Sequence, residues 1–118
     1  MVISIPGIDA AKGLDLFDGD EKNYLIVLRS WLSNTPAVLD KLRNPSAESL
    51  KDYAVSIHSL KGTCANIGAE DLREKARKMN EMAKAGDISG LQSESDAFLK
   101  QADTLVAEVR KWLDKNTG

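Results

Sequence analysis

The chain has 118 residues, of which 42% are apolar and 29% charged, and its formal net charge is −2. These totals predict one soluble globular domain over residues 1–118, and they give no reason to expect a nucleic-acid partner. The longest apolar run, residues 24–28, is far too short to cross a membrane, and the N-terminus lacks the features of a secretory signal.

The N-terminal half predicts a short helix over residues 8–17 and a long one over residues 21–43. Pro36 lies inside the second segment and should remove a backbone hydrogen bond there. The apolar register continues across Pro36, so we expect one kinked helix rather than two. Its apolar positions recur at helical spacing: Tyr24, Leu28, Trp31, Leu32, Val38, Leu39 and Leu42.

A turn at residues 44–46 precedes a third predicted helix, with Ser46 as its N-cap. This helix runs to Ile67, and Gly68 is expected to close it in the left-handed conformation. Its apolar residues follow steps of three and four: Leu50, Tyr53, Ile57, Leu60, Cys64 and Ile67.

Glu70 and Asp71 suit the first turn of a fourth helix, which ends near Gly86. Its apolar stripe consists of Leu72, Ala76, Met79 and Ala83. A fifth helix is predicted over residues 89–115, with a stripe of Leu91, Phe98, Ala102, Leu105, Val109 and Trp112. The sequence therefore predicts an all-α fold, an antiparallel up-and-down four-helix bundle whose short N-terminal helix caps one end.

The only histidine, His58, lies in the third predicted helix. At about 100° per residue, His58 falls about 120° from the mean direction of the apolar residues of that helix, and therefore on its flank. Small or cationic side chains surround it on the same strip: Lys51, Ala54, Lys61, Gly62 and Ala65. The ring is thus expected to be open to a large partner.

Gly62 is unusual because glycine inside a helix costs about 1 kcal/mol relative to alanine. Open space beside the His58 ring and a nearby Lys61 ammonium would suit an anion such as a phosphoryl group. Each feature also has an ordinary explanation: a surface histidine, a solvated lysine face, or a glycine that permits close helix packing. The spacing alone leaves both interpretations open.

The run His58-Ser59-Leu60-Lys61-Gly62 resembles the HxxKG signature of histidine-containing phosphotransfer (HPt) domains. The rest of the chain is similar to bacterial HPt domains at several further places: Gly7-Ile8-Asp9, Gly13-Leu14, Gly19-Asp20, Tyr24-Leu25 and Ala85-Gly86-Asp87.

This resemblance implies a relay module of two-component signalling. Such domains accept a phosphoryl group from an aspartyl phosphate of one receiver domain and pass it to another. The phosphorylated histidine of the family matches His58, its charge-neutralising lysine matches Lys61, and its access glycine matches Gly62. An ungapped alignment places Asn80 where many members have a longer polar residue that hydrogen-bonds the ring.

The implied partners are response-regulator receiver domains and a hybrid histidine kinase. The expected docking surface is the strip around His58: Lys51, Ala54, Val55 and Ala65. The receiver would bring its own Mg²⁺, so we expect this chain to hold no metal and no cofactor. The basic character of the fourth helix is interpreted mainly as a solvated face.

Independent catalysis is not expected, because one histidine and one cysteine cannot form a multi-histidine metal site. Cys64 lies in the apolar stripe and so is a poor partner for His58, while Asp18 and Asp20 sit in a turn and are expected to cap the next helix. The lone cysteine fits a reducing cytoplasm. We expect a cytoplasmic monomer; the alternative is a binding-only helical adaptor in which His58 is not phosphorylated.

Overall fold

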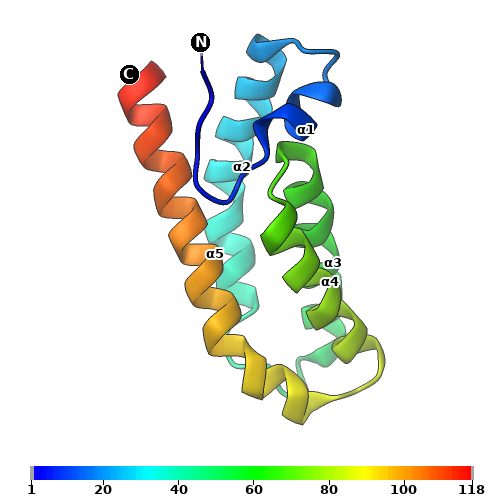
Figure 1. Cartoon of the computed structure of the whole chain (residues 1–118). Helices are drawn as coiled ribbons and strands as arrows, with labels where there is room; N and C mark the ends of the chain where they lie inside the picture. Colours follow the sequence, from blue (N-terminus) through cyan, green and yellow to red (C-terminus); the bar gives the residue numbers. More distant parts are fainter. Residues whose placement is uncertain (1, 118) are drawn as a thin grey trace.

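The computed structural model describes residues 2–117, and within that range the regular structure is entirely helical. The five helices are α1 (Ala10–Asp15), α2 (Glu21–Lys41), α3 (Leu50–Ile67), α4 (Glu70–Lys84) and α5 (Ile88–Thr117). Figure 1 shows that α2, α3, α4 and α5 run alternately up and down, while α1 lies at the end where the α3–α4 turn is found. The predicted all-α bundle with a short N-terminal helix is confirmed.

The four long helices form a closed ring in which each packs against two others. Helix α2 contacts α3 and α5, and α4 contacts the same two helices; the α3–α4 contact is the most extensive. The helices α3 and α5 therefore occupy diagonal corners of the bundle, so a surface on the outer side of α3 faces away from α5.

The helix ends differ from the predictions by a few residues, and the starts of α1 and α3 have an identifiable local cause. Helix α1 begins at Ala10 rather than residue 8, because the Asp9 carboxylate accepts a hydrogen bond from the Lys12 backbone N–H (3.2 Å) and so acts as the N-cap. The prediction that Ser46 caps α3 is wrong. The Ser46 and Ser49 hydroxyls hydrogen-bond each other in a turn (2.9 Å), and the N-cap position is that of Ser49.

The remaining elements agree closely with the sequence pattern. Helix α2 continues through Pro36 as one helix, and the apolar stripes of the four long helices form one core. Trp31 and Trp112 belong to that core, as predicted. Apolar periodicity therefore fixes which face of each helix is buried, and with it the outer face of α3.

Contacts between the N-terminal part of the chain and the α3–α4 turn stabilise one end of the bundle. The Asp9 backbone N–H donates to the Gly68 carbonyl oxygen (2.7 Å), and the Tyr24 hydroxyl donates to the Ile67 carbonyl oxygen (2.7 Å). Burial raises the pKa of Tyr24 to about 12, so its hydroxyl keeps the proton that it donates. These bonds fix where α3 ends, and hence its register against α4.

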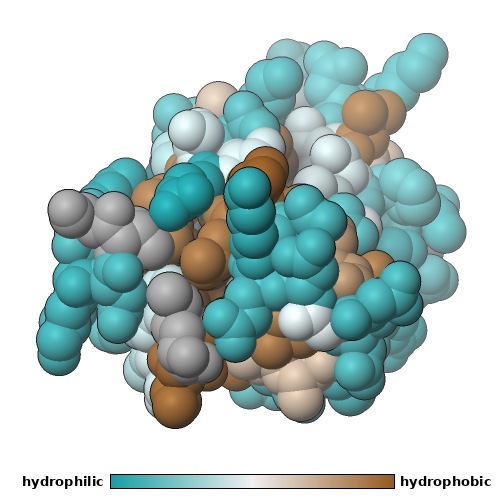
Figure 2. Space-filling model, turned by 90° about the horizontal axis from the view of Figure 1, so that it is seen from above, coloured by the Kyte–Doolittle hydropathy of each residue, from teal (hydrophilic) through white to brown (hydrophobic). Residues whose placement is uncertain are grey.

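Figure 2 shows the surface of this end as separate hydrophobic patches among hydrophilic side chains. Val2 and Leu16 are among the exposed large apolar side chains of the chain. No helix within residues 2–117 combines the length and apolar character that crossing a membrane requires.

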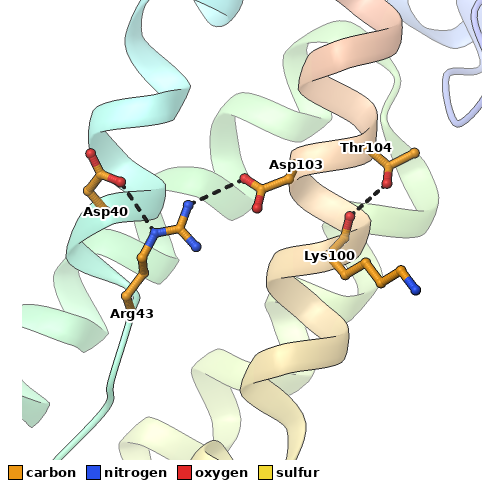
Figure 3. A network of polar contacts seen from close by, with 5 residues as sticks. All are labelled: Asp40, Arg43, Lys100, Asp103 and Thr104. Atoms are coloured by element: carbon orange, nitrogen blue, oxygen red, sulfur yellow. Dashed lines mark hydrogen bonds and ion pairs between the residues drawn. The ribbon is translucent and has the colours of Figure 1, made fainter.

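The edge of the bundle between α2 and α5 carries a small polar network, drawn in Figure 3. The Arg43 guanidinium, just beyond the end of α2, contacts Asp40 (Nε to Oδ1, 3.3 Å) and Asp103 of α5 (Nη2 to Oδ1, 3.5 Å). All three side chains are solvent-exposed, so these pairs orient the loop more than they stabilise the fold. The α3–α4 edge lies on the opposite side of the bundle.

Candidate functional site

His58 projects from the outer flank of α3. The core side of this helix is formed by fully buried side chains: Tyr53, Ile57, Leu60, Cys64 and Ile67. His58 itself is exposed, as the helical spacing predicts. Its imidazole is therefore open to a second protein, and no core packing depends on it.

Gly62 stands one turn beyond His58 and is also exposed. A Cβ atom built at Gly62 would meet no atom within 4 Å. At Gly13, by contrast, a Cβ would press against Tyr24 and the Ile67 carbonyl oxygen (2.9 Å to the latter). The interpretation of Gly62 as a residue that permits close helix packing is therefore wrong, and the space it leaves faces solvent beside His58.

The other residues predicted for this strip also lie at the surface. Lys61 and the small side chains of Ala54 and Ala65 are half-buried, whereas Lys51 is exposed and Val55 is 67% exposed. Neither lysine forms an ion pair with another described residue. The strip thus consists of small and cationic side chains, with one exposed apolar side chain at its border.

Asn80 lies on α4, almost level with His58, because the two residues are nearly equally distant from the Gly68 turn that joins their antiparallel helices. Asn80 is 1% exposed, and its Nδ2 is buried without a hydrogen-bond partner among the described residues. A buried amide donor without a partner costs about 1–3 kcal/mol. No hydrogen bond joins Asn80 to His58 in the described chain, so that contact stays a prediction.

Cys64 cannot support cysteine chemistry at neutral pH. It is fully buried beside Trp31, and burial raises the pKa of its thiol to about 12. Asp20 caps α2, because its carboxylate accepts from the Asn23 backbone N–H (3.2 Å). Within residues 2–117 no three histidine, cysteine or acidic side chains are grouped so that they could hold a metal ion.

Sequence reasoning did not recognise the pairing of charges on α4. The acidic and basic side chains form ion pairs three residues apart: Glu70–Arg73, Glu74–Arg77 and Glu81–Lys84. The signal was present in the segment EDLREKARKMNEMAK, where acids precede basic residues at the spacing of neighbours on one helix face. The buried position of Asn80 was also missed.

Fold and site together describe a helical bundle with a single solvent-facing histidine on a small, cationic strip. A family model, the Hpt domain, matches residues 26–116, and the chain therefore belongs to the Hpt domain family. This family is known for histidine phosphotransfer in phosphorelays, and its members are phosphocarrier modules rather than catalysts. Comparisons with curated proteins and with solved structures gave no match.

Proposed function

We propose that this chain is a phosphorelay intermediate that carries the phosphoryl group on His58. In this proposal His58 accepts the group from the aspartyl phosphate of one receiver domain and passes it to the aspartate of another. The observation that supports it most is the exposed imidazole beside Gly62, where even a methyl group would meet nothing.

The transfer step follows from the chemistry of a neutral imidazole, whose unprotonated ring nitrogen is a nucleophile. Nε2 attacks the phosphorus in line with the bond to the aspartyl oxygen. The N–P bond forms as that P–O bond breaks, and the receiver's aspartate leaves as a carboxylate. His58 then carries the phosphoryl group on Nε2 and keeps its proton on Nδ1; the reverse sequence loads the second receiver.

The transition state of this phosphoryl transfer is loose, and its main requirement is compensation of the negative charge on the phosphoryl oxygens. Lys61, one turn from His58 and without an ion pair among the described residues, supplies one positive charge from this chain, and Lys51 steers the acidic site of the receiver. Ala54, Val55 and Ala65 receive apolar side chains of the receiver. The receiver contributes its own Mg²⁺, so the chain itself acts without metal or cofactor and without independent catalytic activity.

Asn80 is assigned to the orientation of the imidazole, with its Oδ1 accepting the Nδ1 proton so that the Nε2 lone pair faces outward. Burial of an amide that finds no partner for its Nδ2 supports such a functional role, because structure alone would favour an apolar residue there.

Replacing Asn80 by leucine tests that assignment with two measurements. The free energy of unfolding should rise by about 1 kcal/mol, because the unpaired buried donor is removed. The rate of phosphotransfer should fall, because the ring loses its orienting acceptor. Urea denaturation and a transfer time course measure the two effects; a more stable variant with unchanged transfer would remove Asn80 from the site.

Substitutions at Gly62 separate access from folding. Gly62→Ala should stabilise α3 by about 1 kcal/mol, because the added methyl group has free space and alanine favours the helix. Gly62→Leu should keep the helix content but block transfer, since the longer side chain obstructs the approach to His58. Circular dichroism with urea denaturation measures the first effect and labelled phosphotransfer the second. If either variant unfolds, the conclusion that the space beside Gly62 is open would be wrong.

The decisive experiment loads a purified receiver with labelled phosphate, adds this chain and follows the label. Transfer should give a label on the chain that is stable in base and lost in acid, as expected of phosphohistidine. The competing function, a binding-only adaptor, predicts that receivers bind while the chain stays unlabelled. We further propose that the chain is a single domain over residues 1–118 that works as a cytoplasmic monomer, with a hybrid histidine kinase among its partners.

A further inference from the structure

Six of the nine charged side chains of α4 form two parallel rows, and Asp71, Lys75 and Lys78 lie outside them. Three ion pairs, two of them short, link the two rows: Arg73 Nε to Glu70 Oε2 (2.7 Å), Arg77 Nη2 to Glu74 Oε1 (2.6 Å) and Lys84 Nζ to Glu81 Oε1 (3.8 Å). Arg77 adds a second bond from its Nε to Glu74 Oε2 (3.0 Å). Every cation of this set is therefore matched by an acid of the same helix.

Helical geometry separates the two rows around α4. Measured from the buried stripe of this helix, the cations lie about 90° to 130° around the axis, and the acids about 150° to 190°. The cations form the inner basic row, defined as Arg73, Arg77 and Lys84. The acids form the outer acidic row on the crest of the helix, defined as Glu70, Glu74 and Glu81.

The inner basic row borders the strip around His58. Asp71 and Leu72 line a groove of about 470 Å³ together with residues of α5, so the Asp71 side of α4 faces α5. The inner basic row lies on the other side, which faces α3. Because α3 and α4 are antiparallel about the Gly68 turn, Arg77 stands level with Lys61, Arg73 with Ala65, and Lys84 with Ala54.

A protein seated on the His58 strip would thus meet two zones of charge. Its part above α3 meets Lys61 and the inner basic row, which favour acidic groups. Its part that crosses α4 meets the outer acidic row, which repels acidic groups and favours basic ones. The pKa of Glu74 is lowered mainly by its hydrogen bond from Arg77, so this acid stays charged near neutral pH.

We propose that the outer acidic row selects among receiver domains. The partner it fits is acidic at the centre of its contact face, around the phosphorylated aspartate, and basic where its edge crosses α4. This inference rests on the proposed function, since the same surface surrounds the phosphoryl-carrying histidine. Edge charges of this kind chiefly alter association rates and their dependence on salt.

The test uses a double variant, Glu74→Gln with Glu81→Gln, and a control with the same change of net charge. The control is Glu94→Gln with Asp114→Asn, two exposed acids of α5 that form no ion pair with another described residue. One phosphorylated receiver is used in two forms, with either lysine or glutamate at the edge of its contact face. Binding of the unphosphorylated receivers is measured in parallel.

At low ionic strength, the α4 double variant should react about fivefold faster than the natural chain with the glutamate-edged receiver, and more slowly with the lysine-edged one. Both rate differences should become smaller near 0.5 M salt, because the Debye length there is only about 4 Å. The inference would be overturned if the α5 control changed the transfer rates equally, or if the α4 double variant kept the natural chain's preference between the two receivers. A shifted binding preference without any label on His58 would instead overturn the proposed function and leave the surface assignment intact.

Discussion

Replacing His58 by glutamine should give a folded bundle that accepts no phosphoryl group. Glutamine resembles the imidazole in size and polarity but offers no nucleophilic nitrogen, so the loss of label should be complete. Because His58 is exposed and makes no core contact, the free energy of unfolding should stay within about 0.5 kcal/mol of that of the natural sequence. Phosphotransfer from a labelled receiver, with thermal denaturation alongside, measures both quantities.

The matched control for this substitution is Ser59→Ala. Ser59 is also exposed on α3 but lies on a different side of the helix from His58, so its replacement should leave the label unchanged. A label that survives in His58→Gln would place the phosphoryl group on another residue. A label that acid spares and base removes would indicate a serine or threonine phosphoester and exclude phosphohistidine.

The position of His58 could be predicted because it depends on one helix alone. The apolar steps of α3 determine its buried side, and the angle of any other residue on that helix follows from the helical period. The same argument placed Cys64 and both tryptophans correctly in the core. It could not decide why Gly62 is a glycine, because that depends on the distance from neighbouring helices.

The features that the sequence did not predict are of two kinds. Some depend on a residue from another helix or segment, and others depend on which of two similar local hydrogen bonds forms. Asn80 sits at the edge of the apolar stripe of α4, and only the packed neighbours decide that it is buried. Ser46 and Ser49 are both good N-cap residues, and their mutual hydrogen bond decides which one precedes the helix. The contact of Asp9 with Gly68 joins segments far apart in the chain.

Replacing Gly68 by alanine should be among the most destabilising single changes in this chain. Gly68 ends α3 with φ of +79°, a conformation that costs an alanine about 1–2 kcal/mol. An added Cβ would also collide with the Asp9 carbonyl oxygen and strain the bond from the Asp9 N–H to the Gly68 oxygen. We therefore expect a loss of about 3 kcal/mol or more in the free energy of unfolding, measured by urea denaturation.

Gly86 provides the matched control, because it has φ of +70° but open space around its Cβ position. Gly86→Ala should therefore cost only the conformational part, about 1–2 kcal/mol. The difference between the two losses in the free energy of unfolding measures how much the contact of the N-terminal segment with the α3–α4 turn stabilises the fold. Since this turn sets the register of His58 against Asn80 and Arg77, Gly68→Ala should also slow phosphotransfer at temperatures where the variant is still folded. Equal costs for the two substitutions would show that the N-terminal segment does not hold the turn.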